Sequence, residues 1–266
     1  MANNKVAKKE QSSNIVDISL LLEGAETGHN MSNDDMMIPR LRILQDGSPQ
    51  TKKREGEYIE GAEAGHIFDS VSRNIYDGEK GITVVPVSYR TTYIEWKADR
   101  KGLVADHGNK PELLNNCTQS DKGKYFTPEG NEMVRSAEYF VYVVADDGTY
   151  SPALISMASS GLKKSRRWNS MINRLQIPHP SGKGTINPAM FWNAYKIFSV
   201  PESNDEGSWF NWEIEMLYDA KSGGILENLE NGTQLYLEAR SFKKKIAEGD
   251  VKVSPETEET SEEDSF

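Results

Sequence analysis

The side chains best suited to chemistry in this sequence gather in one stretch, Thr149 to Pro201, which contains no Asp and no Glu. It carries seven positive charges, at Lys163, Lys164, Arg166, Arg167, Arg174, Lys183 and Lys196. Acids make up about one residue in seven of the whole chain, so about eight would be expected in a window of this length. A basic surface kept free of acids is typical of a protein that binds a polyanion.

Aromatic rings are interleaved with these cations, namely Trp168, Trp192 and Tyr195. Cations neutralise phosphates and flat rings stack on unpaired bases, so the combination indicates a single-stranded nucleic acid. Tyr93 and Trp209 lie outside the cationic cluster, on strand faces expected to be exposed, and are further candidates for stacking. Core packing is the alternative for each of these rings, because most aromatic residues of strands are core residues. The predicted DNA-binding residues are Tyr93, Lys163, Lys164, Arg166, Arg167, Trp168, Arg174, Lys183, Trp192, Tyr195, Lys196 and Trp209.

Catalytic and metal sites are not expected. Ser181 to Thr185 superficially matches a phosphate-binding loop, but that motif needs Gly where Ile177 stands and Ser or Thr where Gly184 stands. Cys117 is the only cysteine and the four histidines show no ligand spacing, which argues against a metal centre. Paired acids fall in predicted loops or turns. We therefore expect neither an enzyme nor a cofactor.

Six segments that could position these residues are predicted as strands from apolar alternation or from β-branched and aromatic content. They are 38–44, 82–97, 137–145, 150–157, 190–200 and 208–217. Asp146 to Gly148 is a tight turn between the third and fourth of them. The insertion 101–132 is polar and is expected to form a long surface loop.

Two helices are predicted, over 162–175 and 233–247. The first has apolar residues on a broad side, while Lys163, Arg167, Ser170 and Arg174 recur at helical spacing on another. A solvated amphipathic helix that happens to be basic is the alternative reading of that stripe. The acid-free flanking sequence favours a binding surface instead.

The chain of 266 residues is long enough for one large domain with appendages. We expect a flexible arm over 1–35, containing a short anchor at 15–22, then a domain over 36–247 and an acidic tail over 248–266. The absence of a long apolar run excludes a membrane-spanning helix. With its single cysteine, the chain is expected to be a soluble protein of a reducing cytoplasm.

The net charge of −10 is concentrated at the C-terminus, where residues 254–266 hold six acids and no base. A solubilising tail is one explanation. The final Phe266 favours a docking peptide, in which a ring anchors beside charges that steer it. The tail could also occupy the basic surface by Coulomb attraction when nucleic acid is absent.

This ending, Glu262-Glu-Asp-Ser-Phe266, resembles the tails of bacterial and phage single-stranded DNA-binding proteins. It lacks the Ile-Pro-Phe of the bacterial form and is nearer the phage form that ends in Asp-Phe. Residues 157–172, which include Lys-Lys-Ser-Arg-Arg-Trp-Asn-Ser-Met-Ile, are similar to a region of predicted single-stranded DNA-binding proteins in tailed phages. The resemblance implies an OB-fold barrel with insertions, and a tail that recruits replication or recombination enzymes.

The expected fold is therefore mainly β (α+β): an OB-like β-barrel with added helices, long loops and disordered N- and C-terminal tails. The expected function is to bind and protect single-stranded DNA in the cytoplasm of an infected bacterial host. The tail would bind a polymerase, helicase-primase, nuclease or annealing protein through Glu262, Glu263, Asp264 and Phe266. The alternative is a phage structural or host-interaction protein whose basic helix docks on an acidic protein surface.

Overall fold

The computed structural model describes residues 37–98, 100, 102–205 and 207–254. The arm predicted over 1–35, its anchor at 15–22 and residues 255–266 of the predicted tail lie outside the described residues.

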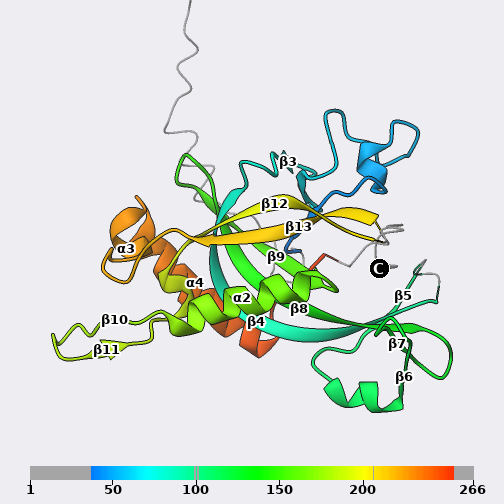
Figure 1. Cartoon of the computed structure of the whole chain (residues 1–266). Coiled ribbons are helices and arrows are strands. Elements are labelled where there is room, and N and C mark those ends of the chain that lie inside the picture. Colours follow the sequence, from blue (N-terminus) through cyan, green and yellow to red (C-terminus); the bar gives the residue numbers. More distant parts are fainter. Residues whose placement is uncertain (1–36, 99, 101, 206, 255–266) are drawn as a thin grey trace, which may run out of the picture.

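One curled sheet dominates the molecule and forms a half-barrel (Figure 1). Its main path runs in the order β13-β12-β4-β8-β9-β1-β2-β3, with β5, β6 and β7 attached at the side. All the pairings are antiparallel except that of β1 with β9. The strands of the path are β1 (Arg40–Ile43), β2 (Ile67–Asp69), β3 (Ile75–Tyr76), β4 (Ile82–Trp96), β8 (Glu132–Val144), β9 (Tyr150–Ala158), β12 (Tyr195–Asn204) and β13 (Gly207–Met216).

The connectivity is that of an OB-like barrel. β4, β8 and β9 form a meander, helix α2 (Gly161–Arg174) follows, and the hairpin β12–β13 returns so that β12 pairs with the start of β4. Five strands in this Greek-key order, with a helix after the third, describe an OB fold. The predicted mainly β, OB-like fold is confirmed, and β1 to β3 are additions to it.

Side chains of the central strand β8 alternate between two cores, as the period of two requires. Tyr139 and Val141 face the interior of the curled sheet, where Trp168 of α2 is also buried. Phe140 and Tyr142 face the outer side, where helix α4 (Gly232–Glu248) packs. The two helices therefore cover opposite faces of the same sheet.

The seam between β1 and β13 is closed by a side chain. The described residues contain no ladder between these strands. Instead, the Gln45 amide Nε2 donates to the carbonyl oxygen of Phe210 at 2.9 Å, and its Oε1 accepts from the Phe210 N–H at 2.8 Å. The amide thus satisfies both backbone groups, as a neighbouring strand would.

The insertion after β4 departs from the prediction of a surface loop. It contains β5 (Leu103–Asp106), a 3₁₀ turn η3 (Pro111–Asn116), β6 (Thr118–Gln119) and β7 (Tyr125–Phe126). β5 pairs with β4 and β7 with β8, because these two long strands continue as a ribbon beyond the barrel. β8 consequently begins at Glu132, five residues before the predicted start.

Other elements also begin or end at residues that differ from the predicted ones. The segment predicted as a strand over 190–200 begins with a 3₁₀ turn, η4 (Met190–Trp192), and β12 starts only at Tyr195. Residues 177–188, which follow α2, contain a small hairpin, β10 (Ile177–Pro178) with β11 (Thr185–Ile186). Two further short elements are η2 (Pro49–Thr51) and α3 (Ile225–Asn228).

Candidate nucleic-acid interface

A groove of about 760 Å³ opens where β8 extends past the end of β9. The insertion forms one wall, through Arg100 and residues 122–125. Asn204 and residues 209–212 of the β12–β13 hairpin form another, and the β9–α2 turn contributes residues 156–162. In an OB fold the ligand lies over strands two and three, between the loop after strand one and the loop between strands four and five. Here these loops are 97–131 and 205–206, so the groove occupies the OB ligand position.

The lining of the groove is strongly cationic. In the described part of the chain Glu132 is the one acid that lines it, against six cations. Low-dielectric walls that carry one sign of charge concentrate the electrostatic field and attract ligands of the opposite sign. The six are Arg40, Arg42, Arg100, Lys122, Lys124 and Arg135.

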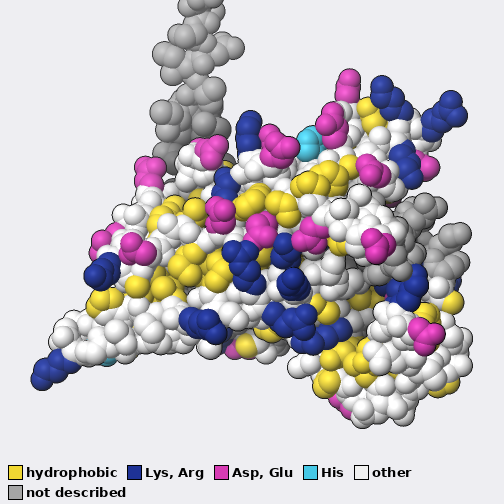
Figure 2. Space-filling model, in the orientation of Figure 1, with side chains coloured by type: hydrophobic (Ala, Val, Ile, Leu, Met, Phe, Trp, Pro, Cys, Tyr) yellow, Lys and Arg dark blue, Asp and Glu magenta, His cyan; other side chains and the backbone are white. Residues whose placement is uncertain are grey.

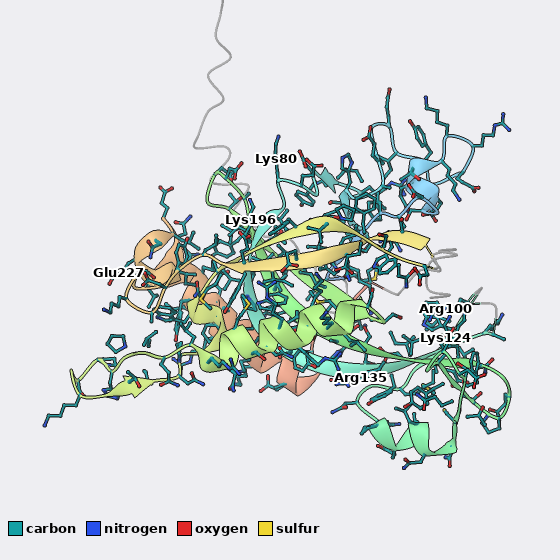
Figure 3. The ribbon with its side chains drawn as sticks, in the orientation of Figure 1. Lys80, Arg100, Lys124, Arg135, Lys196 and Glu227 are labelled. Atoms are coloured by element: carbon teal, nitrogen blue, oxygen red, sulfur yellow. The ribbon has the colours of Figure 1, made fainter. Side chains whose placement is uncertain are left out.

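Glu132 binds two of these cations and offsets one positive charge. Arg100 donates two hydrogen bonds of 2.7 Å to its carboxylate, and the Lys124 ammonium lies 3.8 Å away. The carboxylate belongs to the first residue of β8 and is nearly buried. Its contacts attach the insertion to β8. Arg135 is exposed and makes no ion pair with any described residue (Figure 3).

A second buried acid fixes Arg40. The carboxylate of Glu138, on β8, accepts from Arg40 at 2.9 Å and also from Arg90 at 2.6 Å. Its side chain is fully buried, so the two guanidinium groups supply the compensation that a buried charge needs. The guanidinium of Arg42 lies 5.2 Å from the centre of the Phe68 ring.

Rings line the groove beside the cations. Trp209, Phe210 and Tyr125 are partly exposed and can present a face or edge to a ligand. Tyr93, Trp96 and Trp212 also line it but are nearly buried. Stacking on exposed rings, together with backbone neutralisation, is how OB folds hold single strands.

Two residues of the groove have a strained backbone. Arg100 has φ of 54° and Ser159 has φ of 46°, the left-handed region that residues other than Gly, Asn and Asp rarely adopt. Such outliers cluster at ligand-binding sites, where surrounding contacts hold them in place. Ser159 is the residue at which the chain turns from β9 into α2.

Three rings expected to stack on bases are placed elsewhere. Trp168 and Tyr195 have no exposed surface and Trp192 is 6% exposed. Trp168 stacks on the Tyr139 ring with centroids 4.2 Å apart, inside the barrel core. Their stacking role is therefore corrected to core packing: helix α2 turns Trp168 toward the barrel core, strand alternation turns Tyr195 inward, and Trp192 is buried in the η4 turn.

The predicted basic stripe of α2 is divided between two environments. Lys164 contacts Glu202 at 2.8 Å and Glu213 at 2.9 Å, and Arg167 is also paired with Glu213. Burial alone would raise the pKa of the Glu202 carboxyl, but hydrogen bonds from Lys164 and Asn211 together with the lysine charge lower it below its usual value. These two cations thus tie α2 to the β12–β13 hairpin. Lys163, Arg166 and Arg174 are exposed and have no ion-pair partner among the described residues.

The remaining predicted residues are scattered. Tyr93 and Trp209 line the groove, but Tyr93 is nearly buried, so its predicted exposure is wrong. Lys183 is exposed between β10 and β11. Lys196 lies opposite Glu215 in the β12–β13 ladder. This is the end of the hairpin away from the groove residues Asn204 and Trp209 (Figure 3). The structure therefore does not bring Lys183 and Lys196 together with the groove.

Sequence reasoning missed the cations of the groove. The sequence does contain a signal for Arg40 and Arg42, since the alternation of apolar and basic residues along 38–44 indicates a strand with a basic face. The insertion contains no such signal for its cations, because its lysines are mixed with acids such as Asp121 and Glu129.

The described chain ends beside the groove. The Ser254 N–H donates to the Ile38 carbonyl at 2.9 Å, and its carbonyl accepts from Arg40 Nε at 2.8 Å. Residues 255–266, which carry all six acids of the C-terminal run, follow Ser254 in the sequence, and Ser254 contacts the groove residue Arg40.

A protein-family model described as "Pam3 phage gp34-like protein" matches residues 11–252. The chain belongs to the Pam3 phage gp34-like family. It is thus a phage protein, and the match spans the whole barrel and α4. No curated protein and no solved structure matches it. None of the helices formed by the described residues is long and apolar enough to cross a membrane. Those residues also contain no cluster of His, Cys, Asp and Glu suited to a metal ion.

Proposed function

We propose that this phage protein binds single-stranded DNA in the groove and protects it during phage DNA replication or recombination, without catalysing a reaction itself. The observation that supports the proposal is the position and chemistry of the groove. It lies where OB folds hold their ligands, and cations and partly exposed rings line it together.

In this mechanism the cations contact phosphates and release counterions, while Trp209, Tyr125 and Phe210 offer surfaces to the bases. A duplex hides the faces of its bases inside the stack, so these rings favour a single strand. Arg100 and Lys124 are already held in place by Glu132, and Arg40 by Glu138, so little ordering is required when the ligand arrives.

The acidic tail has two proposed roles. Its terminal residues, Glu262, Glu263, Asp264 and Phe266, would bind replication or recombination proteins in the cytoplasm of the infected host. Because it continues from Ser254 beside Arg40, the tail would also compete with DNA for the groove. DNA binding would then release the tail for partners.

Fluorescence titration tests the groove. The full chain is titrated with single-stranded DNA, duplex DNA and single-stranded RNA at two salt concentrations, alongside Arg135→Gln. We expect single-stranded DNA to bind most tightly, with an affinity that falls steeply as salt rises. Arg135→Gln should weaken binding and reduce the slope of log K against log salt by about 0.7.

Lys80→Gln is the matched control, because Lys80 is exposed and lies far from Arg135 (Figure 3). Equal effects of the two variants, or an affinity that does not change with salt, would contradict the proposal. Absence of binding to any nucleic acid would favour the structural or host-interaction role.

A further inference from the structure

Helix α2 presents a basic face that the groove does not use. Lys164 and Arg167 lean toward the β12–β13 hairpin and are paired with its acids. Lys163, Arg166 and Arg174 follow one another at steps of three and eight residues, so they share one side of the helix, which borders Arg167. All three are exposed and have no acidic partner in the described part of the chain.

This face continues into the groove. Figure 2 shows Lys and Arg side chains following one another across the molecule, over α2 and on toward the insertion. Arg135, which lines the groove, lies beside the N-terminal half of α2 (Figure 3). Arg135 therefore connects the cations of the groove with those of the helix.

The helical face differs from the groove in lacking rings. The aromatic residue of α2, Trp168, is wholly buried against Tyr139. Lys163, Arg166 and Arg174 can therefore contact phosphates but offer no surface on which a base could stack. Eleven residues separate Lys163 from Arg174, so the face is about 16 Å long.

We propose that the bound strand leaves the groove past Arg135 and that its sugar-phosphate backbone continues along Lys163, Arg166 and Arg174. This inference rests on the proposed function. The ligand is then a strand longer than the groove, held by its bases and phosphates in the groove and by its phosphates alone along the helix.

A length series tests the extended path. Oligothymidylates of 4, 8, 16 and 30 nucleotides are titrated against the full chain and the triple variant K163Q/R166Q/R174Q. The variant should bind the 30-mer at least ten-fold more weakly than the unaltered chain, but the 4-mer equally well. Its salt slope for the 30-mer should fall by about two, since three phosphate contacts at about 0.7 each are lost.

The matched control is R240Q/K243Q/K245Q, which removes three exposed charges from α4 on the opposite face of the sheet. It should bind every length like the unaltered chain. If the α2 variant also does so, the extended path is wrong while binding in the groove stands. If it loses the 4-mer as well, the helical face is not separate from the groove. If the unaltered chain binds no oligonucleotide, the proposed function itself fails.

Discussion

At the scale of single residues, Trp209 is a partly exposed tryptophan that lines the groove. It lies opposite Glu202 on the β12–β13 hairpin, three residues before Trp212 of the core. Its odd-numbered position points it away from the interior, because successive strand residues face opposite sides.

Trp209→Ala should therefore weaken binding of single-stranded DNA by about 1–3 kcal/mol, the usual contribution of one base stack. Trp209→Phe should retain most of the affinity, since it keeps a flat ring. Equilibrium titration at fixed salt measures both, and circular dichroism checks that each variant is folded. If the alanine variant binds as tightly as the unaltered chain, Trp209 is not a stacking surface.

Predicting such rings from sequence has a physical limit. Alternation separates Trp209 from Trp212 correctly, because it reports the two faces of a strand. It does not report which end of a hairpin lies near a ligand, and so Lys196 was grouped with residues on the other side of the molecule. Trp168 was grouped with its charged sequence neighbours, although helical geometry turns it into the core.

At the scale of elements, the Gln45 amide joins β1 to β13. Gln45→Ala would leave both backbone groups of Phe210 without these partners and should lower the free energy of unfolding by about 1–3 kcal/mol. Urea denaturation measures the change. Gln234→Ala, which removes an exposed hydrogen bond to Glu238, should change it by less than about 0.5 kcal/mol. Equal effects would show that the seam is held by other contacts.

The attachment of α2 to the hairpin should depend on pH. The pKa of Glu202 is lower in the folded protein than in the unfolded chain, so protons bind the unfolded state more readily. Its stabilising effect is present above the unfolded value of 4.5 and is lost as the pH falls through the folded value. The stability difference between Glu202→Gln and the unaltered chain should therefore shrink between pH 6 and pH 3.5 in urea denaturation. A constant difference would contradict this.

Most elements were predictable because they follow local patterns. The turn at Asp146 to Gly148 is indicated by its residue types, and the amphipathic helix over 162–175 by its helical periodicity. The insertion was not predictable, since β5 has only four residues and β7 two, and both form by pairing with β4 and β8. Its part in the groove comes from this long-range pairing, which no local pattern of residues records.

At the scale of the whole molecule, the tail should oppose DNA binding. Deleting residues 255–266 while keeping Ser254, which is bonded to Ile38 and Arg40, should preserve or tighten the affinity for single-stranded DNA. The same deletion should abolish capture of replication or recombination proteins. Phe266→Ala keeps all six acids and should impair capture alone. Loss of DNA binding on deletion would contradict this model, which titration and pull-down experiments from infected cells can test.

The length of the β4–β8 ribbon has a consequence for how far the insertion can be shortened. Trp96 and Glu132 are partners across the ladder, so the whole insertion 97–131 begins and ends at facing positions. A two-residue Asn-Gly turn could therefore join them, provided that Glu132→Gln removes the acid left without Arg100 and Lys124. The shortened barrel should still fold, as thermal denaturation would show. That result would show that the barrel folds independently of the insertion.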